Sequence, residues 1–262
     1  MPRARRLAST AVVAIFAATG LSACQQSPDV AAYVGGETIT QDRVEQIYDQ
    51  VRDELTTARQ QAQQQGEANG ASPGAVAPLS MPIKQQDVLN TLLSLDVLRK
   101  SAQSHGIKAA AEPTVDQVAQ ARNYSATWEY TKLYTETYQL RAALQGKVVP
   151  AALTEDDLRD VYQRLLAGGA ADPGTSFQDF SSQLSAENKT LLETYVGLRN
   201  EMKTITADDK VKLNPRYGNQ QVTLLSAQAA DGKDVPLVVF TFAGDADEAP
   251  YVTDVSAVTS LA

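Results

Sequence analysis

Apolar side chains recur at helical spacing along most of residues 41–205, and this pattern limits the fold more than any other feature of the sequence. In residues 41–57 the apolar positions lie three or four residues apart, on one face of a predicted helix. Residues 82–106 carry apolar side chains around most of the helix circumference, which predicts a helix buried in the centre of the core. Further helices are predicted after the N-capping residues Thr114, Thr154, Ser176 and Ser185.

Short β-strand patterns flank this helical region at both ends. Residues 30–34 are β-prone and run into a Gly35-Gly36 turn, and Val211 to Gly218 predicts a second strand that leads into a turn at Pro215 and Gly218. A two-stranded ribbon alone is marginally stable in water, so we expect these strands to pair with each other on the helices. The predicted fold class is therefore mainly α, with a small two-stranded β element that pairs the N- and C-terminal ends.

The N-terminus has the features of an export signal. Arg3, Arg5 and Arg6 precede an uncharged run, Leu7 to Leu21, which is shorter than the roughly 20 apolar residues that a transmembrane helix needs. The run ends Leu21-Ser22-Ala23-Cys24, which resembles a bacterial lipobox and contains the single cysteine of the chain. The resemblance implies a lipoprotein signal peptide over residues 1–23, with cleavage before Cys24 and acylation of its sulfur. An ordinary secretory signal with an incidental cysteine is the alternative.

Composition excludes several classes of function. The chain has 23 basic and 31 acidic residues, a formal charge of −8, and removal of the leader would take away three of the arginines. An acidic chain of this kind is a poor ligand for nucleic acids or anionic lipid, so membrane affinity must come from acyl chains. We predict no metal site, no cofactor and no nucleotide site, because no motif for them is present. The single histidine, His105, is expected to complement the end of a helix rather than to catalyse.

The chain divides into a tether, a helical body and a tail. Residues 24–30 are expected to be a short lipidated tether on the extracytoplasmic face of the cell membrane, and residues 31–218 are expected to form the helical domain. Residues 58–80, rich first in Gln and then in Gly, Ala, Pro and Ser, are expected to be a flexible insertion in that domain. Residues 219–262 are expected to be a weakly ordered acidic tail.

Several segments of this body resemble extracytoplasmic chaperones of the SurA/PrsA class. Ala32 to Thr40 is similar to their opening strand, glycine turn and Thr-capped helix start, although Gly35 replaces the usual Asn. Leu89 to Ile107 resembles their long leucine-rich helix, and Thr114 to Val118 resembles the start of the helix that follows. Asn214 to Gly218 is similar to the closing strand of actinobacterial lipoproteins with a SurA-like N-terminal domain. The resemblance covers residues 31–57 and 81–218.

The resemblance implies an ATP-independent chaperone or foldase that assists exported proteins, with unfolded or nascent polypeptides as its partners. SurA and PrsA also carry parvulin domains, which isomerise X-Pro bonds. Residues 150–205, where such a domain would be inserted, have helical patterns, so we expect the parvulin domain to be absent. Two alternatives stay open, namely a degenerate parvulin with peptidyl-prolyl isomerase activity and a non-catalytic scaffold lipoprotein of an envelope complex.

An aromatic stripe is the candidate binding surface of the helical body. Tyrosine and tryptophan combine a large apolar area with a polar edge, which suits contacts with apolar segments of client chains. The alternative is that the stripe packs the core, and both interpretations hold if one edge stays exposed. The stripe consists of Tyr124, Trp128, Tyr130, Tyr134 and Tyr138.

Overall fold

Helices dominate a computed structural model of the protein, which describes residues 29–68 and 80–242. The first four helices are α1 (Gln41–Ala68), α2 (Gln85–Ser104), α3 (Val115–Arg122) and α4 (Glu129–Gln145). They are followed by α5 (Glu155–Ala167), α6 (Phe177–Gln183) and α7 (Ala186–Asp208). The strands are β1 (Val30–Val34), β2 (Glu37–Thr40), β3 (Lys212–Leu213), β4 (Gln221–Gln228) and β5 (Asp234–Thr241). The mainly α fold class is confirmed, and no helix within the described ranges has the length and apolarity needed to cross a membrane.

A small antiparallel sheet joins the two ends of the described chain, in the strand order β2-β1-β3. Gly35, at φ +62°, makes the tight turn between β1 and β2. On the other side of β1, Ala32 pairs with Leu213, and the Asn214 side chain donates a hydrogen bond to the Val30 carbonyl at 2.8 Å. The predicted pairing of the end strands is confirmed for Lys212–Leu213, with β2 as a third strand on the other side of β1. Pro215–Tyr217 do not continue the strand but form a short 3-10 helix, η1.

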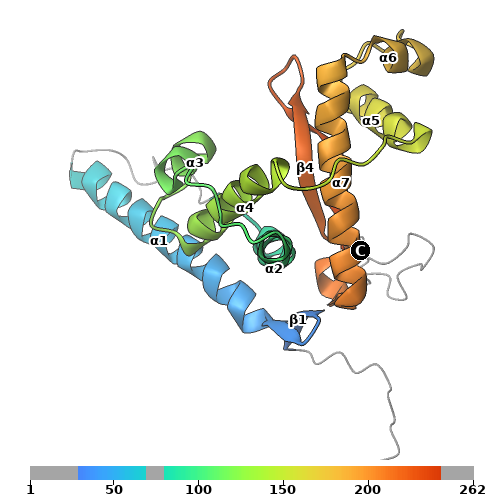
Figure 1. Cartoon of the computed structure of the whole chain (residues 1–262). Helices are drawn as coiled ribbons and strands as arrows, with labels where there is room; N and C mark the ends of the chain where they lie inside the picture. The colour runs from blue at the N-terminus through green and yellow to red at the C-terminus, as the bar shows by residue number, and fades with distance from the viewer. Residues whose placement is uncertain (1–28, 69–79, 243–262) are drawn as a thin grey trace, which may run out of the picture.

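Helix α2 lies at the centre of the molecule, where Figure 1 shows it end-on between α4 and α7. It contacts α1, α4 and α7 as well as β1 and β4, so its apolar residues meet neighbours on every side. Val88, Leu89, Leu93 and Leu98 are fully buried. The prediction of a central helix from its all-round apolar pattern is therefore confirmed.

Helix α1 is longer than the sequence suggested. We expected residues 58–80 to be a flexible insertion, but residues 58–68 continue α1, and Figure 1 shows this end reaching past α3. Gln and Ala are good helix formers, so the Gln-rich run extends the helix with no core of its own. Residues 69–79, which hold most of the Gly and Pro of the segment, lie outside the described residues.

The expectation of a weakly ordered tail from residue 219 is wrong for residues 221–241, which form the β4–β5 hairpin. The turn contains Gly232 at φ +84°, and Val222 pairs with Phe240. One face of the hairpin is buried, and β5 packs on α5 and α7. Burial of the apolar side chains of Val222, Leu224, Val238 and Phe240 stabilises the hairpin, despite the acidic and small residues around them. Residues 243–262 lie outside the described residues.

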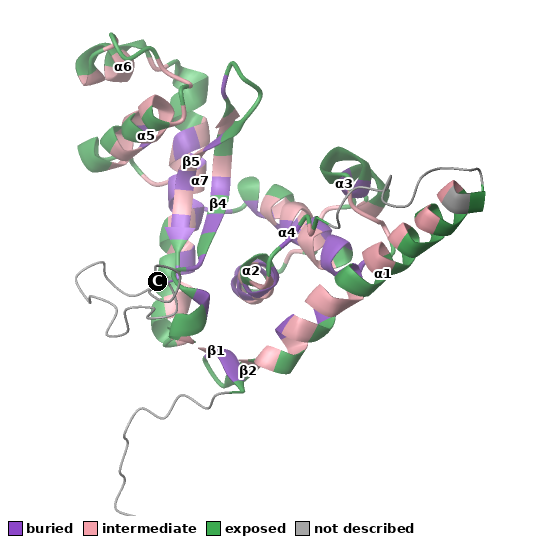
Figure 2. Cartoon of the chain, turned by 180° about the vertical axis from the view of Figure 1, so that it is seen from behind, coloured by how far each residue is buried: buried purple, intermediate pink, exposed green. Residues whose placement is uncertain are grey.

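Helices α5 and α6 lie at the periphery, as the exposed and intermediate colours in Figure 2 show, and Val161 is the one buried residue of α5. An ion pair of 2.7 Å between Asp157 and Arg199 fastens α5 to α7. The segment before α5 crosses α7 at Gly197, where a Cβ atom would lie 2.3 Å from the Val149 carbonyl oxygen. The helices α5–α7 confirm the helical patterns read in residues 150–205.

Candidate functional site

The aromatic stripe predicted from the sequence is one continuous cluster of rings. Tyr130, Tyr134 and Tyr138 follow one another at four-residue intervals on α4, and so share a face of the helix. Tyr130 and Tyr134 stack with centroids 5.7 Å apart, and Tyr138 meets Tyr134 edge-on at 5.1 Å. Tyr124, from the loop after α3, lies 5.8 Å from both Tyr130 and Trp128. The structure therefore brings all five residues together.

The five rings differ in how far solvent reaches them. Trp128 is 3% exposed and Tyr130 is 4% exposed, so both pack in the hydrophobic core. Tyr124, Tyr134 and Tyr138 are half-buried. Trp128 therefore belongs to the core, Tyr130 lies at the boundary between the core and the cavity, and the other three rings keep part of their surface accessible to solvent.

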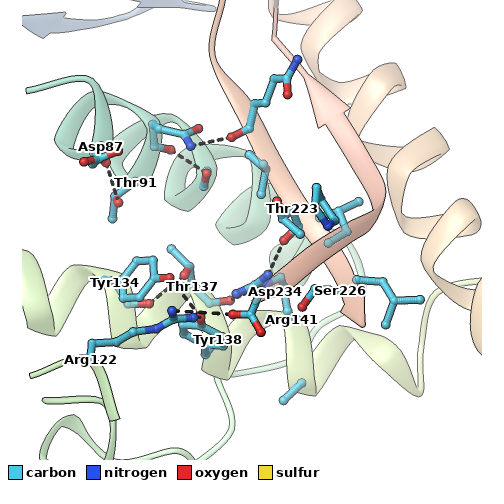
Figure 3. Close-up of a pocket in the computed structure, with 18 of the residues that line it drawn as sticks. Asp87, Thr91, Arg122, Tyr134, Thr137, Tyr138, Arg141, Thr223, Ser226 and Asp234 are labelled. Carbon is cyan, nitrogen blue, oxygen red and sulfur yellow. Dashed lines mark hydrogen bonds and ion pairs between the residues drawn. The ribbon is translucent and has the colours of Figure 1, made fainter. Parts of the chain in front are cut away.

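The four tyrosines of the cluster line a cavity of about 630 Å3 between the helices and the hairpin. Its walls come from α2, from the tyrosine face of α4, and from the whole run Gln221 to Ser226 of β4. Figure 3 shows the side chains of α2 at the upper left of the cavity, those of α4 below it, and the hairpin on its right. The volume lies within the range of about 300–1,000 Å3 that is usual for ligand sites.

Two arginines lie among the tyrosines. Arg122 donates a hydrogen bond of 2.8 Å to the Tyr138 hydroxyl, and the Arg141 guanidinium lies 4.4 Å over the Tyr138 ring. Burial alone would raise the pKa of Tyr138, but hydrogen bonds with Tyr134 and Arg122 and the charges of both arginines together lower that pKa. Burial raises the pKa of the neighbouring Tyr134, so the shared hydrogen bond joins two phenols of unequal acidity.

Two side chains attach the hairpin to the helices across the cavity. Asn90 of α2 donates a hydrogen bond to the Gln221 carbonyl, and Arg141 of α4 donates one to the Thr223 carbonyl. These carbonyls belong to the edge of β4 that does not pair with β5, so this edge faces α2 and α4. The cavity is therefore walled by polar backbone on one side and by aromatic rings on another.

His105 lies at the C-terminal end of α2, as predicted, and its Nε2 is 3.0 Å from a Glu201 carboxylate oxygen of α7. It lies outside the tyrosine cavity and has a structural partner. No group of three or more His, Cys, Asp or Glu side chains suited to a metal occurs in the described part of the chain. Cys24, the predicted lipidation site, lies outside the described residues.

The aromatic stripe predicted from the sequence did not include the arginines or the hairpin wall of this site. Arg141 lies three residues after Tyr138, a helical spacing that places it on the tyrosine face, so the sequence did contain a signal for it. Arg122 reaches Tyr138 from a different helix, and the β4–β5 hairpin comes from the segment that was expected to be weakly ordered. No spacing within the sequence indicates these two contacts.

Comparison with known proteins identifies the first half of the chain. The profile of the SurA-like N-terminal domain matches residues 4–144, which include β1, β2 and the first four helices except Gln145. No curated protein and no solved structure gives a significant match. The cavity therefore has one wall from the matched region, in α2 and α4, and another from the hairpin beyond it. The chain belongs to the family of proteins with a SurA-like N-terminal domain.

Proposed function

We propose that this protein is a membrane-anchored, ATP-independent chaperone that binds unfolded segments of exported proteins. The observation that carries the proposal is the tyrosine-lined cavity between the family domain and the hairpin. Domains of the SurA type bind unfolded polypeptides in general, and a preformed aromatic surface is what such binding needs.

The cavity suits an extended polypeptide for two reasons. Tyrosine rings offer large apolar contact area at a low cost in side-chain entropy. Their hydroxyl groups bind water when no segment occupies the cavity. The polar edge of β4 and side chains such as Asn90 and Thr91 offer hydrogen-bonding groups for peptide backbone. A site built in this way binds many sequences weakly rather than one sequence tightly.

A holdase assay on the purified full chain tests the proposal. We expect a several-fold molar excess to suppress aggregation of a chemically denatured secreted protein, without ATP. Tyr134→Leu with Tyr138→Leu should weaken the effect, because it keeps apolar volume but removes the aromatic faces and hydroxyl groups. Tyr162→Leu is the matched control, since Tyr162 is also half-buried but lies on α5, outside the cavity. Aggregation that proceeds unchanged with the wild-type chain would refute the proposal.

The same protein should not accelerate X-Pro isomerisation. Residues 150–205, where a parvulin domain would be inserted, lie in and around the helices α5–α7 instead. A protease-coupled assay with a proline peptide measures this directly. A rate clearly above background would favour the isomerase interpretation over a simple holdase.

The membrane anchor is the second part of the proposal. The arginine-rich start, the uncharged run and Leu21-Ser22-Ala23-Cys24 support lipidation at Cys24 on the extracytoplasmic face. Stable attachment needs more than one acyl chain, which a diacylated cysteine supplies. Palmitate labelling of cells that express the wild type or Cys24→Ser tests it. Equal labelling of the two chains, or a mature N-terminus other than residue 24, would contradict the anchor.

A further inference from the structure

The charged groups that line the tyrosine cavity are two acids and two bases, and three of them already have partners. An Asp87 carboxylate oxygen accepts the Lys84 N–H at 2.7 Å, where it caps the start of α2. Arg122 and Asp234 form an ion pair at 3.8 Å. Arg141 forms no ion pair with any carboxylate of the described residues. Its positive charge is therefore the one in the cavity wall that no acid in the described ranges neutralises.

The Arg141 guanidinium is nevertheless held firmly in place. Its Nε donates to the Thr137 carbonyl at 3.2 Å, and one Nη donates to the Thr223 carbonyl. Its central carbon, Cζ, lies over the Tyr138 ring. Guanidinium has five N–H donors, so these two hydrogen bonds leave N–H groups on both Nη atoms for a ligand. A guanidinium that is fixed before binding loses little entropy when it pairs with a planar anion.

We propose that Arg141 binds a carboxylate of the client segment, so that the cavity prefers an acid next to an apolar or aromatic side chain. The carboxylate accepts N–H groups from both Nη atoms of Arg141, while the neighbouring side chain lies against Tyr134 and Tyr138. Either an Asp or Glu side chain or the C-terminal carboxylate of a chain supplies this chemistry. The inference rests on the proposed chaperone function and names the class of segment that it selects.

Peptide binding to the full chain, followed by fluorescence anisotropy, tests this preference. The probes share one Tyr- and Leu-containing core and differ at one position, which is Glu, Gln or Lys, each with an amidated C-terminus. A fourth probe has Gln at that position and a free C-terminal carboxylate. A charge-assisted hydrogen bond is strong enough for the Glu peptide to bind about tenfold to a hundredfold more tightly than the Gln peptide. The free-acid probe shows whether a chain terminus is accepted as well.

Variants then separate the carboxylate contact from general affinity. In Arg141→Gln the Glu and Gln peptides should bind with equal affinity, whatever loss of the contacts with Thr223 and Tyr138 does to both, and Arg141→Lys should keep part of the preference. The control is Arg159→Gln, because the Arg159 guanidinium also lies over an aromatic ring, at 4.3 Å from the centroid of Phe177, but outside the cavity.

The outcomes separate the carboxylate preference from the proposed chaperone function. Equal binding of the Glu, Gln and free-acid peptides by the wild type overturns the carboxylate preference but leaves the chaperone proposal standing. A preference that survives Arg141→Gln assigns the carboxylate to another residue and also overturns the inference. If Arg141→Gln does not fold, the comparison of peptides on the wild type still decides. Absence of both peptide binding and aggregation suppression refutes the two proposals together.

Discussion

Replacement of Asp157 by Asn should weaken the attachment of α5 to α7 more than any other single change of charge on α5. The Asp157 and Arg199 side chains are 10% and 16% exposed, and their ion pair measures 2.7 Å. Breaking a buried pair from one side costs about 3–5 kcal/mol, because the remaining charge has no partner. Asparagine keeps an oxygen that can accept the Thr154 N–H, and both side chains retain some solvent contact. We therefore expect a loss of about 2–3 kcal/mol in the free energy of unfolding.

The loss should depend on pH in a direction fixed by the ion pair. Burial alone would raise the pKa of Asp157, but hydrogen bonds from Thr154 and the Arg199 guanidinium hold that pKa below its ordinary value. A lowered folded-state pKa stabilises the fold above the unfolded pKa of about 3.9, and this contribution disappears as pH falls through the folded value. The gap between wild type and Asp157→Asn should therefore be constant from pH 7 to 5 and close below about pH 4.

Urea unfolding at several pH values, followed by circular dichroism, measures both effects. The matched control is Asp160→Asn on the same helix, since the Asp160–Arg164 pair is more exposed and should cost about 0.5 kcal/mol or less. Adding Arg199→Met to Asp157→Asn removes the unpaired charge and should recover part of the loss. If Asp157→Asn costs no more than Asp160→Asn, or if its cost is the same at pH 3 and pH 7, the reasoning is wrong.

Three further predictions concern the other contacts between elements. Gly197→Ala should cost about 1–3 kcal/mol in a denaturant titration, because its Cβ would overlap the Val149 carbonyl, whereas Gly146→Ala, with open space around it, should cost little. Lys100→Met removes the cation between Asp96 and Asp209, and burial already raises the pKa of Asp96. Without the lysine, ionisation of Asp96 in the folded state costs more, so the variant should lose stability relative to wild type as pH rises from about 4 to 6. A difference in unfolding free energy that does not change with pH would contradict this. Asn214→Ala removes the side-chain bond to Val30 and should cost about 1 kcal/mol, with faster amide exchange in β1 as the check.

Local patterns in the sequence were sufficient for most of the helical fold. The all-round apolar pattern of α2, the Thr114 capping box and the glycine turn after β1 are each encoded within a few residues, and all three are present in the structure. Pairing of β1 with β3 was predictable because a β-prone segment lies at each end of the helical region. The β4–β5 hairpin was missed because its stability comes from packing on α5 and α7, which no local pattern reveals.

The candidate site shows the same division between local and long-range information. Tyr130, Tyr134 and Tyr138 repeat every four residues, so their common face could be inferred before their surroundings were known. Which part of the stripe is buried depends on distant elements: Trp128 packs in the core, while the four tyrosines line the cavity that faces the hairpin. The special position of Arg141 depends on the Thr223 carbonyl, which is remote in sequence.

The family match stops at residue 144, yet β1 has its outer neighbour at Lys212–Leu213. During synthesis the outer edge of β1 therefore has no partner strand until Lys212–Leu213 have been made. A fragment cut at the end of the family match would keep that edge open permanently and invite pairing with other chains. Any shortened form meant for crystallisation or binding work needs the segment from Val211 to Tyr217 supplied, either in the chain or as a separate peptide.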